Sequence, residues 1–365
     1  MNFFMPTRLF TGDDCIYQHR DELSALGGRC LVVTGHTSAK ASGALDDVCR
    51  ALEGCGVTSV TWDGVTENPP LVACREAGRV AADAGARFIL GVGGGSALDA
   101  AKAIAVFAAN PELDEDGFYA KAWETQPLPI ALVGTTAGTG SEVTKVSVLT
   151  DSRGRKHSIH DDRLYAAVAF GDSRHTHTCS RAVTLSCGID AVAHATESYF
   201  SRKADDISRA FAVRAVRLAY EPLACAAAFE ELTPQLRRQL YEASILGGLA
   251  INTTGTCFPH NVGYYLTETH HVPHGFASAA FLPAMLEAAR AYDPAYHAAF
   301  FDECGVSDEA LDNLIEASLP AFDFSLTAGQ IEAALPRWEN NGSVKNTRAD
   351  VTIDTIATAL TSLFA

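Results

Sequence analysis

The first half of the chain alternates short apolar runs with longer segments of helical spacing. Four runs rich in apolar and β-branched residues, each followed by a glycine or a polar turn, predict strands at residues 29–34, 57–62, 87–92 and 129–133. Between them, helical spacing predicts helices at about residues 41–52, 71–84 and 97–109. Strands separated by helices of ten or more residues are typical of βαβ units and a mostly parallel sheet.

The second half of the chain follows a different pattern. From Val183 onward, segments rich in Ala, Leu and Glu have helical spacing, and no convincing strand pair occurs. We expect prolines to interrupt these helices at Pro222, Pro234, Pro259, Pro273 and Pro283. The sequence therefore predicts an α/β nucleotide-binding domain over residues 1–180 and an all-helical domain over residues 181–365, packed around a shared cleft.

Composition narrows the class of protein. The 365 residues are 47% hydrophobic and 20% charged, which is typical of globular proteins. The net charge of −16 disfavours nucleic acid and anionic membranes as partners. No apolar run reaches the roughly 20 residues of a membrane-spanning helix, and no signal peptide is evident. Ten scattered cysteines without a Cys-x-x-Cys pair are typical of a reducing compartment, so we expect a soluble cytoplasmic protein.

A glycine-rich turn joins the predicted strand at 87–92 to the following helix. Gly93, Gly94, Gly95 and Ser96 precede an Ala-rich segment. Glycines let a phosphate approach the backbone, and a helix N-terminus supplies unpaired N–H donors. The spacing is neither the dinucleotide fingerprint Gly-x-Gly-x-x-Gly nor a Walker loop. A tight turn that binds nothing is the alternative interpretation.

A second polar loop, residues 135–142, follows the predicted strand at 129–133. Its three threonines, serine and two glycines offer hydroxyl and N–H donors. On its own it could be an ordinary polar loop. Ligands of doubly wound sheets bind where such loops leave the carboxyl ends of neighbouring strands.

Four residues of the helical half have the chemistry of a metal site. Asp190 and His194 are four residues apart in a predicted helix and therefore share one face. His260 and His274 follow later in the chain. One carboxylate and three imidazoles suit a divalent transition metal with an open coordination position. Any one of these histidines, taken alone, is more often a hydrogen-bonded core or helix-end residue than a ligand.

These motifs occur together and in order, and the combination resembles the iron-containing (group III) alcohol dehydrogenase family over nearly the whole chain. The 14-residue separation of His260 and His274 belongs to the resemblance. Further matches are residues 33–35, 67–69 and 186–190. The resemblance implies a dehydroquinate-synthase-like arrangement in which a nicotinamide cofactor and a metal face each other across the cleft.

Residue roles follow from the resemblance by position. It implies that Fe²⁺, or Zn²⁺ in some members, is bound by Asp190, His194, His260 and His274. The cofactor pyrophosphate and its surroundings would be held by Gly94, Gly95, Ser96 and Asp99. The nicotinamide half would be lined by Thr135, Thr136, Thr139 and Val148. Lys156 matches a lysine that reaches the cofactor ribose, and Thr178 matches another cofactor contact.

Two positions depart from the family pattern. His175 stands where a leucine is common, which puts that cofactor contact in doubt. Tyr264 stands where some members carry a histidine proposed in proton transfer. His270 and His271 could substitute as a proton relay; the alternative is that they are surface histidines.

The residue after the first predicted strand bears on cofactor choice. Relatives that use NAD often have an aspartate there, which repels a 2′-phosphate, whereas this chain has Gly35. The hydroxyl and cationic side chains that follow, Ser38 among them, could hold a phosphate. We therefore expect NADP(H) to be favoured over NAD(H). The alternative is that Gly35 only makes the turn and both cofactors serve.

The predicted function is reversible hydride transfer between a small alcohol or aldehyde and NAD(P), with the metal polarising the substrate oxygen. Alternatives are a reductase of a carboxylate-bearing carbonyl, a lyase of the dehydroquinate synthase type, and a nucleotide binder without catalysis. The resemblance also implies a homo-oligomer, with a homodimer as the first expectation.

Overall fold

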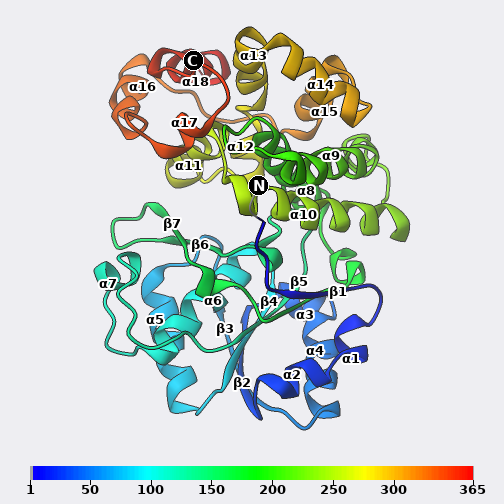
Figure 1. Cartoon of the computed structure of the whole chain (residues 1–365), viewed down its shortest axis with the longest axis vertical. Helices are drawn as coiled ribbons and strands as arrows, with labels where there is room; N and C mark the ends of the chain where they lie inside the picture. Colours follow the sequence, from blue (N-terminus) through cyan, green and yellow to red (C-terminus); the bar gives the residue numbers. More distant parts are fainter. Residues whose placement is uncertain (1–2, 365) are drawn as a thin grey trace. The chain divides into compact units, whose positions relative to one another are not determined.

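A computed structural model describes residues 3–364, so residues 1, 2 and 365 of the two expected domains lie outside the described part. The chain forms two compact units (Figure 1). One comprises residues 5–179, and the other comprises residues 180–364 with the short segment 3–4. Within residues 3–364, no helix is both long enough and apolar enough to cross a membrane.

The first unit is built on a six-stranded parallel sheet in the order β1-β8-β5-β4-β2-β3. Its strands are β1 (Arg8–Thr11), β2 (Arg29–Gly35), β3 (Thr58–Val65), β4 (Phe88–Gly93), β5 (Ile130–Gly134) and β8 (Val168–Gly171). The central strands β4 and β5 are buried along their whole length, as is typical of a parallel sheet covered on both faces. The predicted α/β fold with a mostly parallel sheet is confirmed.

Helices cover both faces of this sheet (Figure 1). Successive residues of β2 enter different cores: Leu31 packs with α5 and α6, and Val32 packs with α4. The helices are α1 (Cys15–Gln18), α2 (Asp21–Leu26), α3 (Ser38–Ala41), α4 (Ala44–Gly54), α5 (Leu71–Asp83), α6 (Gly95–Ala109) and α7 (Glu115–Tyr119). Short 3-10 turns are η1 (Ser141–Val143), η2 (Asp162–Leu164) and η3 (Ser173–Thr176).

The sequence did not predict strands β1 and β8, nor two further strands of this unit. Edge strand β1 has four residues and owes its conformation to pairing with β8. Strands β6 (Val146–Thr150) and β7 (Lys156–His160) form a separate antiparallel hairpin. Ser147 occupies a fully buried position of β6, so the polar residue obscures the alternation that marks a strand.

The second unit is helical, as predicted. Its helices are α8 (Arg181–Tyr199), α9 (Asp206–Ala227), α10 (Pro234–Thr254), α11 (Phe258–His270), α12 (His274–Ala279), α13 (Leu282–Tyr292), α14 (Pro294–Cys304), α15 (Asp308–Ser318), α16 (Ala328–Ala334), α17 (Gly342–Asn346) and α18 (Ile353–Phe364), with η4 (Leu335–Arg337). Helices α8, α9 and α10 pack against one another (Figure 1).

The expected break at Pro222 is wrong, because Pro222 lies inside α9. A proline in a helix interior removes one backbone hydrogen bond. Extensive packing of α9 against α8 and α10 compensates for this loss. The other four prolines stand at or next to helix starts, where the missing N–H costs nothing.

Candidate functional site

One face of α8 carries the first two predicted metal ligands. Asp190 and His194 are four residues apart and both are buried. Glu197, three residues after His194, continues the same face and is fully buried as well. Burying two carboxylates in a helical unit is costly unless each finds a partner, so this face needs compensating groups.

Helices α11 and α12 supply those groups. His260 Nε2 lies 3.3 Å from Asp190 Oδ1, and His274 Nε2 lies 3.8 Å from the same oxygen. One ligand atom from each of these three residues lies within 4.8 Å of the other two. His260 is fully buried, whereas the His274 side chain is 27% exposed, so the cluster has an open side at His274.

His194 lies against this cluster but outside the tight set of three. Its ring stacks on that of His260 with centroids 4.5 Å apart, and its Nδ1 lies 4.0 Å from Asp190 Oδ2. The structure thus brings the four predicted ligands together, with His194 in ring contact.

Glycines allow the helices to approach this closely. A Cβ on Gly275, next to His274, would stand 1.8 Å from the Ser186 carbonyl oxygen and 2.9 Å from the Cβ of Asp190. On α10, a Cβ on Gly247 would stand 3.0 Å from the Ala191 carbonyl oxygen. Glycine thus lets α12 and α10 approach the part of α8 that carries the two predicted ligands.

In this cluster the carboxylates and the imidazoles stabilise each other's charged forms. Burial alone would raise the pKa of Asp190, but the three surrounding imidazoles hold that pKa well below its ordinary value. Burial opposes protonation of His260, yet the carboxylates of Glu197 and Asp190 raise the pKa of this histidine to about 10. A cation that binds here must therefore displace a proton.

The donor set fits a divalent transition metal. Asp190 Oδ1 and His260 Nε2 are buried, and neither makes a hydrogen bond within residues 3–364. Metal–ligand bonds of about 2.0–2.2 Å in a tetrahedral arrangement separate ligand atoms by about 3.3–3.6 Å. The observed separations of 3.3 and 3.8 Å are close to that range. A cation between these atoms would satisfy groups that the protein leaves without hydrogen bonds.

The sheet of the first unit has a topological switch point between β2 and β4. The chain leaves β2 toward β3 on one side and leaves β4 toward β5 on the other. Ligands of open parallel sheets bind at the carboxyl ends of the strands that border such a point. Gly35 ends β2, and Gly93 ends β4, so both predicted cofactor turns start at this place.

The glycine turn and the threonine loop lie side by side. Gly93 pairs with Gly134, and the Thr135 N–H donates to the Gly93 carbonyl at 2.9 Å. A Cβ on Gly95 would stand 2.6 Å from Thr139 Cγ2, so a larger residue there would collide with the loop. A Cβ on Gly94 would stand 3.1 Å from Thr136 Cγ2. The two sequence motifs thus form one surface beside the N-terminus of α6.

Asp99 is used inside the protein. Its Oδ1 accepts from Ser141 Oγ at 2.6 Å, and its Oδ2 accepts from the Val148 N–H at 2.9 Å. Lys102, one turn further along α6, is fully buried and donates to Ser141 Oγ and to the carbonyls of Ser141 and Val146. This network fastens α6 to the threonine loop and to the β6–β7 hairpin. Asp99 thereby holds the surroundings of the predicted phosphate site.

The remaining predicted cofactor residues lie around these loops. Val148 stands on β6, and Lys156 begins β7, where it pairs with Thr150. Ser38 Oγ would be 3.9 Å from a Cβ on Gly35. Thr178 is exposed, and the thiol of its neighbour Cys179 contacts the Thr135 carbonyl at 3.5 Å.

The predicted proton-relay histidines lie at the end of α11. The ring of His270 stacks on Phe324 at 4.0 Å, and His271 is exposed with φ 55°. Tyr264, by contrast, lies against a predicted ligand: its ring is 5.6 Å from that of His274 and nearly parallel to it. The relay role of the two histidines stays a prediction.

A second group of acidic and histidine side chains lies at the carboxyl edge of the sheet. His175 is buried, and its Nε2 lies 3.0 Å from Asp47 Oδ2, so this departure from the family pattern points toward α4. Asp172, near His175, pairs with the guanidinium of Arg174. Asp47 pairs with Arg50 at 2.8 Å. The carboxylates already have cationic partners, so we interpret this group as an ion-pair network.

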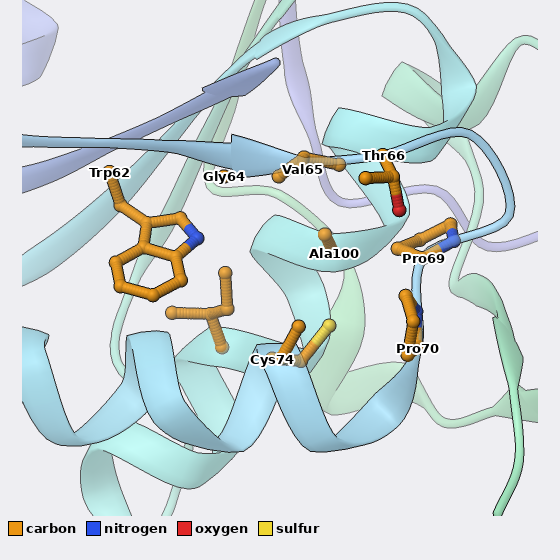
Figure 2. Close-up of a pocket in the computed structure, with 10 residues that line it drawn as sticks. Trp62, Gly64, Val65, Thr66, Pro69, Pro70, Cys74 and Ala100 are labelled. Atoms are coloured by element: carbon orange, nitrogen blue, oxygen red, sulfur yellow. The ribbon is translucent and has the colours of Figure 1, made fainter. Parts of the chain in front are cut away.

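A small pocket lies between β3, α5 and α6 (Figure 2). Its volume of about 10 Å³ has room for roughly one water molecule. Trp62, Pro69 and Ala100 give it an apolar lining. Burial raises the pKa of its one thiol, Cys74, to about 12, so this group stays protonated at neutral pH. Its lining residues include no charged side chain and no histidine, so we assign the pocket no catalytic role.

Sequence analysis missed two residues that organise these sites. Glu197 stands seven residues after Asp190, a spacing that places it on the ligand face of α8 and could have revealed it. Lys102 lies within the Ala-rich α6, where an isolated lysine gives no sign that it is buried.

Comparisons with known proteins agree on one family. The iron-containing alcohol dehydrogenase model matches residues 6–173, and the C-terminal model of the Fe-containing alcohol dehydrogenase family matches residues 184–316. Long-chain-alcohol dehydrogenase 1 of Geobacillus thermodenitrificans is 35% identical over 273 residues, covering 73% of this chain and 67% of that protein. The 1,3-propanediol dehydrogenase of Citrobacter freundii is 31% identical over 322 residues, covering 87% of this chain and 83% of that protein. The crystal structure of an iron-containing alcohol dehydrogenase from Thermotoga maritima superposes with a TM-score of 0.92 at 32% identity, covering 100% and 99% of the two chains.

Proposed function

The chain belongs to the iron-containing alcohol dehydrogenase family, and from that premise we propose that its helical unit binds the catalytic cation through Asp190, His194, His260 and His274. As a member it is a metal-dependent oxidoreductase that interconverts alcohols and carbonyl compounds with NAD(P). Supporting the ligand assignment is one observation above all: ligand atoms of Asp190, His260 and His274 converge within 4.8 Å.

The protein residues have separate tasks in this proposal. A divalent cation held by these ligands supplies Lewis acidity, which lowers the pKa of an alcohol hydroxyl and polarises a carbonyl. Asp190 contributes the negative charge of the set, and the partly exposed His274 marks the side from which a substrate oxygen can approach. The family relationship favours this reaction over the lyase and over a binder without catalysis.

The cofactor is proposed to bind with its pyrophosphate at the N-terminus of α6. Gly94, Gly95 and Ser96 leave the backbone accessible there, and the first N–H groups of the helix have no acceptor within the helix. The nicotinamide half would be lined by Thr135, Thr136 and Thr139 beside Val148. Lys156 would reach the cofactor ribose, and Thr178 would make a further contact with the cofactor. NAD(P) supplies the hydride acceptor when bound.

We expect NADP(H) to be favoured over NAD(H), because Gly35 carries no carboxylate to repel a 2′-phosphate. Iron is the expected metal and zinc the alternative, since one carboxylate and three imidazoles accept either. A homodimer is the expected assembly, to be checked by light scattering on the eluting peak of a sizing column.

The test is an anaerobic assay of the purified protein with Fe²⁺, NADPH or NADH, and a panel of short aldehydes. Loss of the reduced-nicotinamide absorbance that requires Fe²⁺ and stops with a chelator is the expected result. His274→Ala should lose most of the bound metal and most of the activity. Full metal content and full activity in this variant would falsify the ligand assignment.

A further inference from the structure

Glu197 is a fully buried carboxylate that the reaction itself does not use. It lies on α8, on the same face as Asp190 and His194. A buried carboxylate persists only where hydrogen bonds compensate for the water it has lost. Within residues 3–364, the Glu197 side chain accepts two such bonds, one at each oxygen, and both come from the start of α11.

The first bond runs to a backbone group and the second to a predicted metal ligand. Glu197 Oε2 accepts from the Cys257 N–H at 2.6 Å, at the N-cap of α11. Glu197 Oε1 forms a hydrogen bond with His260 Nδ1. A carboxylate only accepts, so His260 Nδ1 carries the hydrogen in this pair.

The opposite nitrogen of the ring faces Asp190. His260 Nε2 lies 3.3 Å from Asp190 Oδ1, and neither atom makes a hydrogen bond within the described part of the chain. With Nδ1 tied to Glu197, Nε2 is the nitrogen left to present a lone pair to a cation. Carboxylates that bind the far nitrogen of a ligating histidine fix its tautomer and orientation and strengthen it as a donor.

We propose that Glu197 is a positioning residue that holds His260 in the tautomer and orientation required for cation binding through Nε2. The inference rests on the proposed function, because it needs His260 to be a ligand. Glu197 acts through His260 and through the start of α11, and it does not touch the substrate.

Thr347 provides a matched control. It is fully buried, and its Oγ1 accepts from the Phe258 N–H at 3.2 Å. Phe258 directly follows Cys257, whose N–H donates to Glu197. Thr347→Val removes an anchor of the same helix start and leaves the Glu197–His260 pair in place. It therefore reports what a purely structural loss does to metal binding.

The experiment compares wild type, Glu197→Gln and Thr347→Val. Each metal-free protein is titrated with Zn²⁺ against a chromophoric chelator, and thermal melting without metal measures its stability. A glutamine has one acceptor for two donors, so we expect Glu197→Gln to bind Zn²⁺ about 10–100-fold more weakly. Thr347→Val should bind close to wild type even where it melts at a lower temperature.

Three outcomes would overturn the inference. Equal Zn²⁺ affinity in Glu197→Gln and wild type shows that the pair does not matter, and an equal loss in Thr347→Val shows that the effect is structural. If the wild-type protein binds neither Zn²⁺ nor Fe²⁺, this result overturns the proposed function and the inference with it.

A second measurement remains if Glu197→Gln does not fold. In the Zn²⁺-loaded wild-type protein labelled with ¹⁵N-histidine, two-bond ¹H–¹⁵N correlations identify the tautomer of each ring, and His260→Asn assigns the signal. We expect a protonated Nδ1 and a metal-bound Nε2. The opposite tautomer contradicts the proposal.

Discussion

Gly35 is the residue at which cofactor preference can be tested most directly. It ends β2 at the switch point of the sheet, and a Cβ added there would lie 3.2 Å from the Val65 carbonyl oxygen. A carboxylate about 4 Å from a 2′-phosphate costs roughly 1–4 kcal/mol between aqueous and protein-surface conditions. Gly35→Asp should therefore shift the ratio of kcat/KM values from NADPH toward NADH by about tenfold or more.

Gly35→Ala is the control for this change, because it brings the same Cβ near Val65 without a charge. Its cofactor ratio should equal that of the wild type. The same ratio in all three proteins would show that Gly35 does not face the 2′-position.

Asp172 is a residue whose titration affects stability. Burial raises the pKa of this carboxyl, but Arg174 and two backbone N–H groups outweigh burial and lower it below its ordinary value. A carboxyl whose pKa is lower in the folded than in the unfolded state stabilises the fold above its unfolded pKa of about 3.9. That contribution disappears as pH falls through the folded pKa.

We expect the stability of the wild type to fall below about pH 4. Asp172→Asn should be less stable than the wild type at pH 7, and this difference should shrink as pH decreases below 4. Urea unfolding at pH 7, 5, 4 and 3 measures both curves. A constant difference across this range would contradict the assignment.

At the scale of elements, Lys102 connects α6 to the segments that follow β5. Its ammonium group replaces water with three close oxygen acceptors and lies 3.7 Å from Asp99. Lys102→Met leaves Asp99 and two carbonyls without their cation, which should destabilise the protein by about 3–5 kcal/mol. Urea unfolding measures this loss, and fluorescence titration should show weaker NADPH binding.

Ser147→Ala is the comparison for Lys102→Met. Ser147 Oγ donates one neutral hydrogen bond to the Asp99 carbonyl at 2.8 Å. Its removal should cost about 1 kcal/mol and leave cofactor affinity near the wild-type value. If both variants lost equal stability, the buried charge would have no special role.

The contact between α8 and α12 depends on Gly275. An alanine there would overlap the backbone of α8, so α12 must move away and take His274 with it. We expect Gly275→Ala to lose more than about 3 kcal/mol of stability and most of its metal affinity, since an overlap with backbone exceeds ordinary overpacking.

Gly329→Ala, on α16, is the matched substitution in open space. It should be neutral or stabilising by less than about 1 kcal/mol, because alanine is the better helix former. Thermal melting and metal titration of both variants test the pair. Unchanged metal affinity in Gly275→Ala would show that metal binding does not depend on where α12 places His274.

For the molecule as a whole, the metal should stabilise mainly the helical unit. All four predicted ligands belong to residues 180–364, and the three helices that carry them meet at the proposed cation site. Removing the metal removes a contribution of RT ln(1 + [M]/Kd) to folding, about 4 kcal/mol at 1,000 times Kd.

Hydrogen exchange with and without metal, in the absence of cofactor, tests this expectation. Exchange should accelerate in α8, α11 and α12 after chelation and stay unchanged in α6 and β4. Equal acceleration in both units would show that the metal acts on the whole fold.

Strong local patterns determined most of the architecture in advance. The buried strands β2, β4 and β5 are continuous apolar runs, and the glycines and threonines after β4 and β5 mark the turns that meet at one edge of the sheet. The i, i+4 spacing of Asp190 and His194 guarantees a shared helix face. These features depend on neighbours in the chain, so they are readable without a fold.

Tertiary structure alone decided the rest. Edge strand β1 is set by pairing with β8, which is distant in sequence, and the β6–β7 hairpin is bound to α6 through Asp99. Helix α9 continues through Pro222 while it packs against α8 and α10. The convergence of His260 and His274 on Asp190 depends on three packed helices, and the burial of Lys102 and Glu197 depends on acceptors and donors far away in sequence. A sequence shows which groups a residue carries, but only packing removes their water and so decides which partners they must bind.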